Sequence, residues 1–132
     1  MYNIGKVTFW VRMVVDIIDV SYVNQKVRLC FTNYDIMKRK IGNNETRALK
    51  MRLDQITAAI SFDEYLALNL GKPHLLTGDL LNCYGISITG NIRLIIKPLC
   101  TNHAPETLKK CTKIEVKGVV KYHEGKKEWL IS

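Results

Sequence analysis

The hydrophobic pattern of the chain changes near residue 71, from helical spacing before it to alternation after it. The clearest helical signal is formed by Leu49, Leu53, Ile56 and Ile60, which follow one another at intervals of four, three and four. Because side chains three or four residues apart share one side of a helix, these residues predict a single apolar stripe. The stripe indicates a helix that packs on a core.

Polar residues mark the expected starts of the helices. Asn24 precedes a stretch that ends at Gly42 and predicts one or two short helices. Asn43 or Asn44 is expected to cap the helix with the apolar stripe, and Ser61 is expected to cap a short helix that ends near residue 68. The half of the chain before residue 71 is therefore expected to be mainly helical.

After residue 83 apolar and polar side chains alternate, as in half-buried strands. Two alternating runs on either side of Gly90 predict a hairpin, and their apolar sets share a face only if Ile88 opposes Ile92. This register leaves a three-residue loop centred on Gly90, which is available for a positive φ. It also turns Arg93 away from the face of Leu94, so Arg93 is expected on the open side of the sheet.

The outer strands complete the expected order. Residues 13–23 are rich in β-branched side chains and predict a first strand, and residues 101–110 read as a loop. Residues 112–122 predict a last strand whose one face carries Ile114, Val116, Val120 and Tyr122. Strand, helices, then three or four strands indicate an α+β domain, with the helices on one face of a small antiparallel sheet.

The length of 132 residues suits one domain, expected over 17–132. Residues 1–16 are either the start of the first strand or an N-terminal extension, with Met13 as the alternative start of the protein. The apolar stretch 7–23 is interrupted by charged residues and lacks a small-residue cleavage site, so we expect neither a signal peptide nor a membrane span.

Charge and cysteine usage narrow the class of protein. With 20 Lys and Arg against 12 Asp and Glu, the net charge of +8 predicts attraction to a polyanion, foremost a nucleic acid. A basic surface that serves solubility, or one that docks on an acidic protein, has the same composition. The four cysteines form no C-x-x-C pair and have no zinc-site spacing, so we expect reduced thiols in a cytoplasmic protein.

The run GKPHLLTGDLLNCYGISITGNIRLIIK, from Gly71 to Lys97, resembles the signature region of the RelE/ParE superfamily, in its HigB-like killer-protein branch. In that signature a His and an apolar residue lead to a Gly-Asp turn, a Tyr-x-Ile strand and an Arg-Leu-Ile strand. The helical stretches upstream and the closing IEVKGVVKYHEGK downstream also resemble this branch. The likeness covers about Ile17 to His123.

The resemblance implies a RelE-like fold and the toxin of a type II toxin-antitoxin system, which cleaves mRNA on the ribosome and inhibits translation. It implies a metal-independent endoribonuclease without a cofactor, in the bacterial cytoplasm and not at a membrane. The implied partners are the ribosome, mRNA and a cognate antitoxin of the helix-turn-helix, HigA-like kind. In such cleavage the 2′-hydroxyl attacks the adjacent phosphate, so side chains must transfer protons and stabilise the phosphorane.

By the same resemblance, the catalytic positions are His74, Arg93, Tyr122 and His123. His74 would act as general base or acid, and the fork of Arg93 would bind a phosphate. Tyr122 would stack on a base, and His123 would transfer a proton. Strict alternation sends Tyr122 and His123 to opposite faces, so both reach one site only if the strand bends, for example at a bulge near Gly118.

Two positions depart from the family pattern, because Thr77 stands where relatives carry Lys and Lys121 stands where they carry Asp. Lys72, Lys97 and Lys121 are the expected phosphate-binding cations. The departures leave two alternatives open, a catalytically weakened homologue that binds an antitoxin and a ParE-like gyrase inhibitor. Trp129, in the C-terminal tail, is expected either to pack on the core or to hold the antitoxin.

Overall fold

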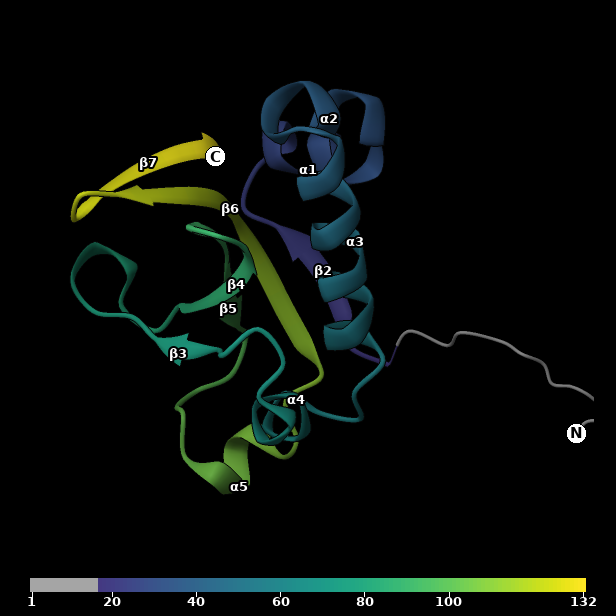
Figure 1. The fold of residues 1–132 in the computed structure, drawn as a ribbon. Helices are drawn as coiled ribbons and strands as arrows, with labels where there is room; N and C mark the ends of the chain where they lie inside the picture. Colours follow the sequence, from purple (N-terminus) through teal and green to yellow (C-terminus); the bar gives the residue numbers. More distant parts are fainter. Residues whose placement is uncertain (1–16) are drawn as a thin grey trace, which may run out of the picture.

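A computed structural model describes residues 17–132, so the expected N-terminal extension and residues 13–16 of the first strand lie outside the described residues. Figure 1 shows α1, α2 and α3 on one side of a twisted sheet, with α4 and α5 at its lower end. The helices are α1 (Gln25–Thr32), α2 (Tyr34–Ile41), α3 (Asn43–Thr57), α4 (Phe62–Leu68), α5 (Pro105–Leu108) and the 3-10 turn η1 (Gly78–Leu80). The strands are β2 (Asp19–Tyr22), β3 (His74–Leu75), β4 (Tyr84–Thr89), β5 (Ile92–Pro98), β6 (Lys113–His123) and β7 (Lys126–Ile131).

The described strands form one sheet in the order β2-β6-β5-β4-β3, and β7 pairs with β6 beside β2. Every pair is antiparallel except β2 with β6, which is parallel. The fold class is therefore α+β, with helices on one face of a mostly antiparallel sheet. The parallel edge differs from the expected all-antiparallel sheet, and it is possible because the long intervening chain lets β2 and β6 run in the same direction.

Two of the expected helix starts are confirmed and one is wrong. The Asn24 side chain accepts a hydrogen bond from Val27 N at 2.9 Å, and Ser61 accepts one from Glu64 N at 3.3 Å. The helix α3, in contrast, begins at Asn43 itself behind Gly42, and no side chain caps it. The glycine, with φ of +99°, turns the chain directly from α2 into α3, so neither Asn43 nor Asn44 occupies the capping position.

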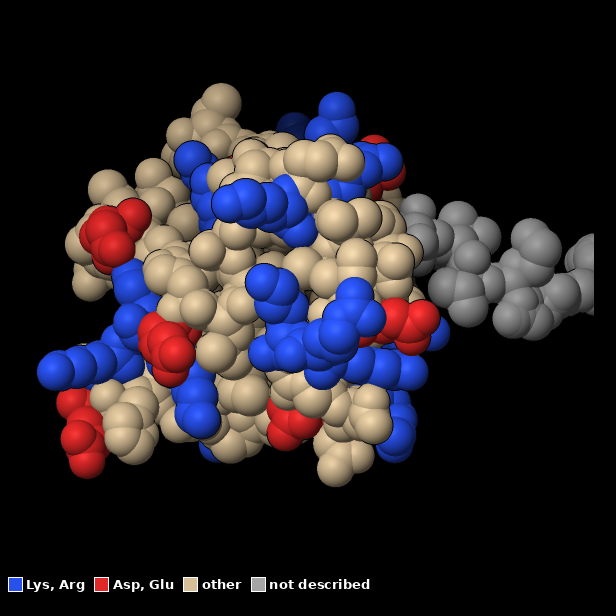
Figure 2. Space-filling model, turned by 90° about the horizontal axis from the view of Figure 1, so that it is seen from above, with Lys and Arg blue, Asp and Glu red and all other residues tan. Residues whose placement is uncertain are grey.

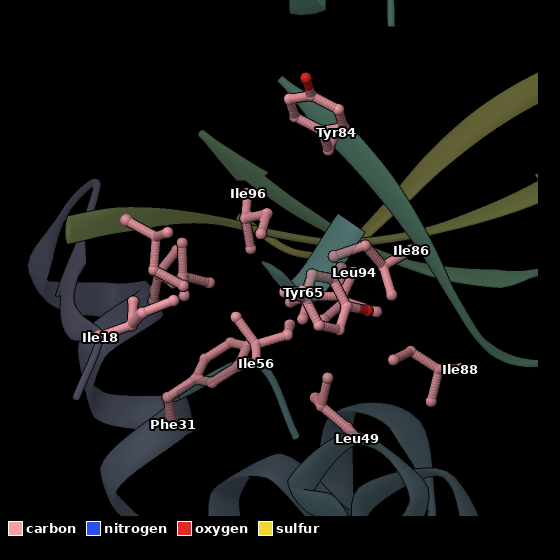
Figure 3. Close-up of a cluster of buried hydrophobic side chains, with 14 of the residues drawn as sticks. Ile18, Phe31, Leu49, Ile56, Tyr65, Tyr84, Ile86, Ile88, Leu94 and Ile96 are labelled. Carbon is pink, nitrogen blue, oxygen red and sulfur yellow. The ribbon is translucent and has the colours of Figure 1, made fainter. Parts of the chain in front are cut away.

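The apolar stripe of α3 packs on the sheet through part of its length. Leu49 and Ile56 are fully buried and Leu53 is partly buried, whereas Ile60 is 63% exposed. Because α3 ends at Thr57, Ile60 lies in the turn that follows and is no longer on the stripe. In Figure 3, Leu49 and Ile56 face the sheet residues Leu94 and Ile86. Side chains buried in this way each stabilise the fold by about 1.5–3 kcal/mol.

The β4–β5 hairpin keeps the predicted register over most of its length. Ile86 opposes Leu94 and Ser87 opposes Arg93, as expected. Near the turn, however, it is Thr89 that opposes Ile92, so Ile88 is bulged and the connection has two residues rather than three. Gly90 there has the expected positive φ, +48°. The bulge lets both isoleucines face the helices while the turn stays tight.

A second bulge divides β6. The register with β5 shifts between Ile95 and Ile96, which leaves Lys117 without a partner beside Gly118, whose φ is +147°. The sequence names a bulge near Gly118 as the condition for Tyr122 and His123 to share a site, and the bulge that forms there reverses the alternation. The predicted common face is wrong, because Ile114 and Val116 belong to the main core whereas Val120 and Tyr122 belong to a cluster on the other face.

The C-terminal part contains two elements that the pattern does not predict. The expected loop 101–110 includes one helical turn, α5, and the tail forms β7, which pairs with β6. Trp129 in β7 packs with Cys83, Ile95 and Val120, in a small cluster on the face away from the helices. All four cysteines are free thiols, and within residues 17–132 no helix is both long and apolar enough to cross a membrane.

Candidate functional site

A groove of about 760 Å³ lies where the loop after α4 meets the β4–β5 hairpin. Its lining residues are Arg52, Asn69, Leu70, Gly71, Lys72, His74, Ser87, Gly90 and Arg93. This set contributes three permanent cations and one imidazole, and it contains no carboxylate. We call it the His74–Arg93 groove. Its charge and hydrogen-bond donors suit an anion such as a phosphate.

Arg93 reaches the groove from the open face of the sheet, the face that the main helices leave uncovered. Its neighbours Ile92 and Leu94 belong to the main core, so the Arg93 side chain points the other way and is only partly buried. Nη1 donates to the carbonyl oxygens of Gly90 at 2.7 Å and of Ile92 at 3.1 Å. Within residues 17–132 the guanidinium makes no other hydrogen bond, so donors remain for a bound anion.

His74 lies on the same face, in the short strand β3. It pairs with Gly85, and a Cβ built on Gly85 would lie 3.5 Å from Cε1 of the imidazole. Because Gly85 has no side chain, the imidazole ring can lie close over β4. Nδ1 lies 3.4 Å from the Lys72 carbonyl oxygen, and the side chain is exposed. An exposed imidazole can exchange protons with a ligand or with water, as acid–base chemistry requires.

The loop that carries Lys72 and His74 is held tightly against β4. Ser87 N donates to the Gly71 carbonyl at 2.8 Å, and the Tyr65 hydroxyl donates to the Leu70 carbonyl. Gly71 has φ of +75°, and a Cβ there would lie 2.9 Å from Ser87 O. Burial raises the pKa of Tyr65 to about 12, so its hydroxyl keeps the donated proton at neutral pH.

Arg52 is the groove residue that sequence reasoning missed. Helical spacing puts Arg52, like Arg47 and Lys50, mostly off the apolar stripe of α3, which predicts a basic side chain on the outer surface of the helix. In the structure it is partly buried, Nε donates to Ser87 O at 3.2 Å, and Nη1 donates to Gln55 Oε1 at 2.6 Å. Helical spacing alone gives no signal for this role, because it depends on where α3 crosses the edge of β4.

The expected residues of the closing strand are not in this groove. Tyr122 is on the same face as Arg93, but it packs with the small cluster around Val120. Lys121 opposes Ile92, is exposed and points to the helix side, and His123 opposes Lys126 at the exposed end of β6. Because the bulge lies before Val119 and the pairing is regular after Val120, Tyr122 and His123 still point to opposite faces.

The remaining expected site residue, Lys97, also lies outside the groove, and so does Thr77, which departs from the family pattern. Lys97 shares the face of Arg93, but it is four residues along β5, about 13 Å away at strand spacing, and it borders two other hollows. Thr77 precedes η1 and is exposed. Of the seven expected site residues, the groove therefore brings together His74, Arg93 and Lys72.

Comparison with known proteins adds a likeness in fold. No protein-family model matches the chain, and no curated protein matches it in sequence. Among solved structures, the YoeB–YefM complex from Staphylococcus aureus is 17% identical with a TM-score of 0.48, covering 80% of this chain and 97% of that chain. The YoeB dimer from the same organism is 15% identical with a TM-score of 0.49, covering 81% and 98%. At this level of similarity neither structure carries functional information for this chain.

Proposed function

We propose that this chain is the toxin of a bacterial type II toxin-antitoxin pair, an endoribonuclease that cleaves mRNA on the ribosome in the cytoplasm. The observation that carries the proposal is the His74–Arg93 groove, which joins an exposed imidazole to three cations without any carboxylate. The net charge of +8 supports a polyanionic substrate, and the resemblance of residues 71–97 to the RelE/ParE signature supports the class of toxin.

The reaction proposed for the groove is an intramolecular transesterification of one phosphodiester. The 2′-oxygen forms a bond to phosphorus while the bond from phosphorus to the 5′-oxygen breaks, which leaves a 2′,3′-cyclic phosphate and a 5′-hydroxyl. Neutral His74 accepts the proton of the 2′-hydroxyl, and the leaving oxygen takes a proton from water or from protonated His74 in a later step. Arg93, Arg52 and Lys72 offset the charge of the phosphorane.

The test is induced expression in bacteria, with growth and mapped mRNA ends as the readouts. Wild type is expected to stop growth and to produce cleaved mRNA, and His74→Ala or Arg93→Ala to lower cleavage at least 100-fold. His123→Ala is the matched control, because it removes an exposed imidazole outside the groove. Normal growth with intact mRNA in the wild type, or equal loss in His123→Ala, would count against the proposal.

One observation favours a second candidate function, a homologue that binds an antitoxin without cleaving RNA. Only one of the expected pair of histidines lies in the groove, so a second titrating side chain to protonate the leaving group is missing from its lining. Under this alternative the chain copurifies with a co-expressed helix-turn-helix antitoxin, and its expression alone leaves mRNA intact. DNA damage with intact mRNA would instead indicate a gyrase inhibitor.

A further inference from the structure

A second cationic groove lies between α2 and α3, on the helical side of the molecule. Its lining residues are Tyr34, Lys38, Asn43, Thr46, Arg47 and Lys50, around a volume of about 350 Å³. None of them borders the His74–Arg93 groove. We call this second site the α2–α3 groove. Figure 2 shows more Lys and Arg than Asp and Glu side chains at the end of the molecule that α2 and the start of α3 form.

The sequence builds this groove from two helical stripes. In α3, Asn43, Thr46, Arg47 and Lys50 follow at intervals of three, one and three, so they lie on one side of the helix. Opposite them, α2 contributes Tyr34 and Lys38, which are four residues apart. The stripe begins at the first residue of α3, so the free N–H groups of the helix start lie at the end of the groove.

Among the residues that the structure describes, no side chain caps the start of α3, although the acidic Glu45 lies in its first turn. The capping position is Gly42, and no side chain forms a capping hydrogen bond. Glu45 reaches back toward Gly42, where its Oε1 would meet an added Cβ, but it does not line the groove. A 15-residue helix that starts without a cap presents partial positive charge and N–H donors, a combination that favours a bound anion.

The buried side chain of Thr46 is an observation independent of the helix start. It is only 4% exposed, and its Oγ1 has no hydrogen-bond partner among residues 17–132. A buried hydroxyl without a partner is unfavourable, and native proteins satisfy nearly all such groups. Thr46 lines the groove, so a rotation about its χ1 angle would let the hydroxyl donate to an acceptor oxygen bound there.

The charges around the groove select the kind of acceptor. Lys38, Arg47 and Lys50 form no ion pair, since the described part of the chain has only two, Lys117 with Glu115 and Lys127 with Asp79. The Lys50 ammonium lies 4.8 Å from the centroid of the Tyr34 ring. Burial and the charge of nearby Asp54 raise the pKa of Tyr34, so the phenol stays neutral.

We infer that the α2–α3 groove binds a phosphate group of an RNA strand. Three cations, a hydroxyl donor and a helix start together match the several oxygens and the charge of a phosphate. Tyr34 adds an aromatic surface beside them, which suits a nucleotide better than an acidic peptide. The inference concerns binding alone and does not depend on cleavage in the other groove.

The first experiment titrates inorganic phosphate into the protein and follows backbone amide signals by NMR. Saturable shifts are expected at residues 43–46, with binding about tenfold weaker in Arg47→Gln. Arg39→Gln is the matched control, because Arg39 belongs to α2, is exposed, and lies outside the groove lining. Equal weakening in both variants, or shifts that do not saturate, would overturn a defined site.

The second experiment measures binding of a labelled single-stranded RNA as a function of salt. Thr46→Val keeps the shape and charge, so it is expected to weaken RNA binding about threefold or more with an unchanged salt dependence. Arg47→Gln is expected to reduce the slope of log affinity against log salt by about 0.7. Polyglutamate and RNA are then each added as competitors of bound phosphate. If polyglutamate displaces phosphate from the α2–α3 groove and RNA does not, the groove binds an acidic protein and the inference is wrong.

Mapped mRNA ends keep this inference separate from the proposed function. Arg93→Ala is expected to abolish cleavage and to leave the phosphate shifts at residues 43–46 in place. If the wild type does not cleave mRNA, only the proposed function is contradicted. If phosphate causes no shifts at residues 43–46, only the inferred phosphate site in the α2–α3 groove is contradicted.

Discussion

The two faces of the sheet differ in how their residues are used. The helix-covered face carries Leu94 and Ile96, both fully buried, in a core that extends to α3 and α4. The open face carries a smaller cluster around Ile95 and, beside it, the partly buried Arg93. Alternate residues of β5 therefore pack in the main core, and the residues between them lie on the open face, where Arg93 carries a charge. Substitutions of neighbouring residues on this strand should therefore have separate effects, on stability at one position and on the charge of the open face at the next.

The largest expected effect is a separation between Leu94 and Arg93. Leu94→Ala creates a cavity in the main core and is expected to lower the free energy of unfolding by about 2–5 kcal/mol. Arg93→Ala removes two hydrogen bonds at the surface and is expected to cost about 1 kcal/mol. Urea unfolding measures both. Equal losses would show that the open face contributes to stability as much as the covered one.

A smaller effect is expected at the loop that borders the groove. Gly71→Ala forces a side chain into a left-handed conformation and against Ser87 O, which should cost about 1–3 kcal/mol and displace His74. Gly78→Ala is its control, with φ of +70° but nothing within 4 Å, so only about 1 kcal/mol is expected. Unfolding and RNA cleavage are measured together, and cleavage equal in both variants would contradict a fixed loop.

Tyr65→Phe tests how α4 holds the same loop. Loss of the hydrogen bond to Leu70 O should cost about 1–2 kcal/mol at neutral pH. Because the pKa of Tyr65 is raised from 10.0 to about 12, the stabilisation by its neutral phenol is complete below pH 10 and is lost as the pH rises through about 12. The stability difference between the two proteins should therefore shrink in alkali. Tyr22, Tyr34 and Tyr84 also have raised pKa values, but they are present in both.

The smallest effect is expected at the edge of the open face, where Lys127 donates to Asp79 at 2.8 Å. That hydrogen bond, with the charge of Lys127, lowers the pKa of the exposed Asp79 below its usual 3.8. The stabilisation is therefore present above about pH 4 and is lost as the pH falls through the lowered pKa. Asp79→Asn should lower the Tm slightly at pH 7 and not at all in strong acid, and a pH-independent difference would contradict this origin.

Periodicity predicted the parts of the fold that depend on neighbours in sequence. The helix starts at Asn24 and Ser61 and the hairpin register at Ile86 and Leu94 follow from local hydrogen bonding and alternation. The faces of β6 did not, because one extra residue at Lys117 reverses all the side chains beyond it. Gly118 indicates locally that a bulge can form there, but its register and its effect on the faces are set by the pairing of β6 with β5 and β7.

The candidate site was predictable to the same limit. The hairpin register placed Arg93 on the open face, and the resemblance to a known signature drew attention to His74. Arg52 entered only with the structure, since its position depends on how α3 crosses β4. His123 and Lys121 remain predictions without support from the groove geometry, because the strand end that carries them points elsewhere.

The bulge in β6 also decides which chain segments protect the border of the sheet. Before it, residues 113–116 pair with β2, and after it, residues 119–123 pair with β7, on the same border. Removing the last seven residues would leave backbone N–H and C=O groups in the second half of β6 without partners. Such an unpaired strand edge favours pairing with a strand of another molecule. We therefore expect β7 to protect the sheet from aggregation, and a shortened protein should form oligomers even where the His74–Arg93 groove is intact.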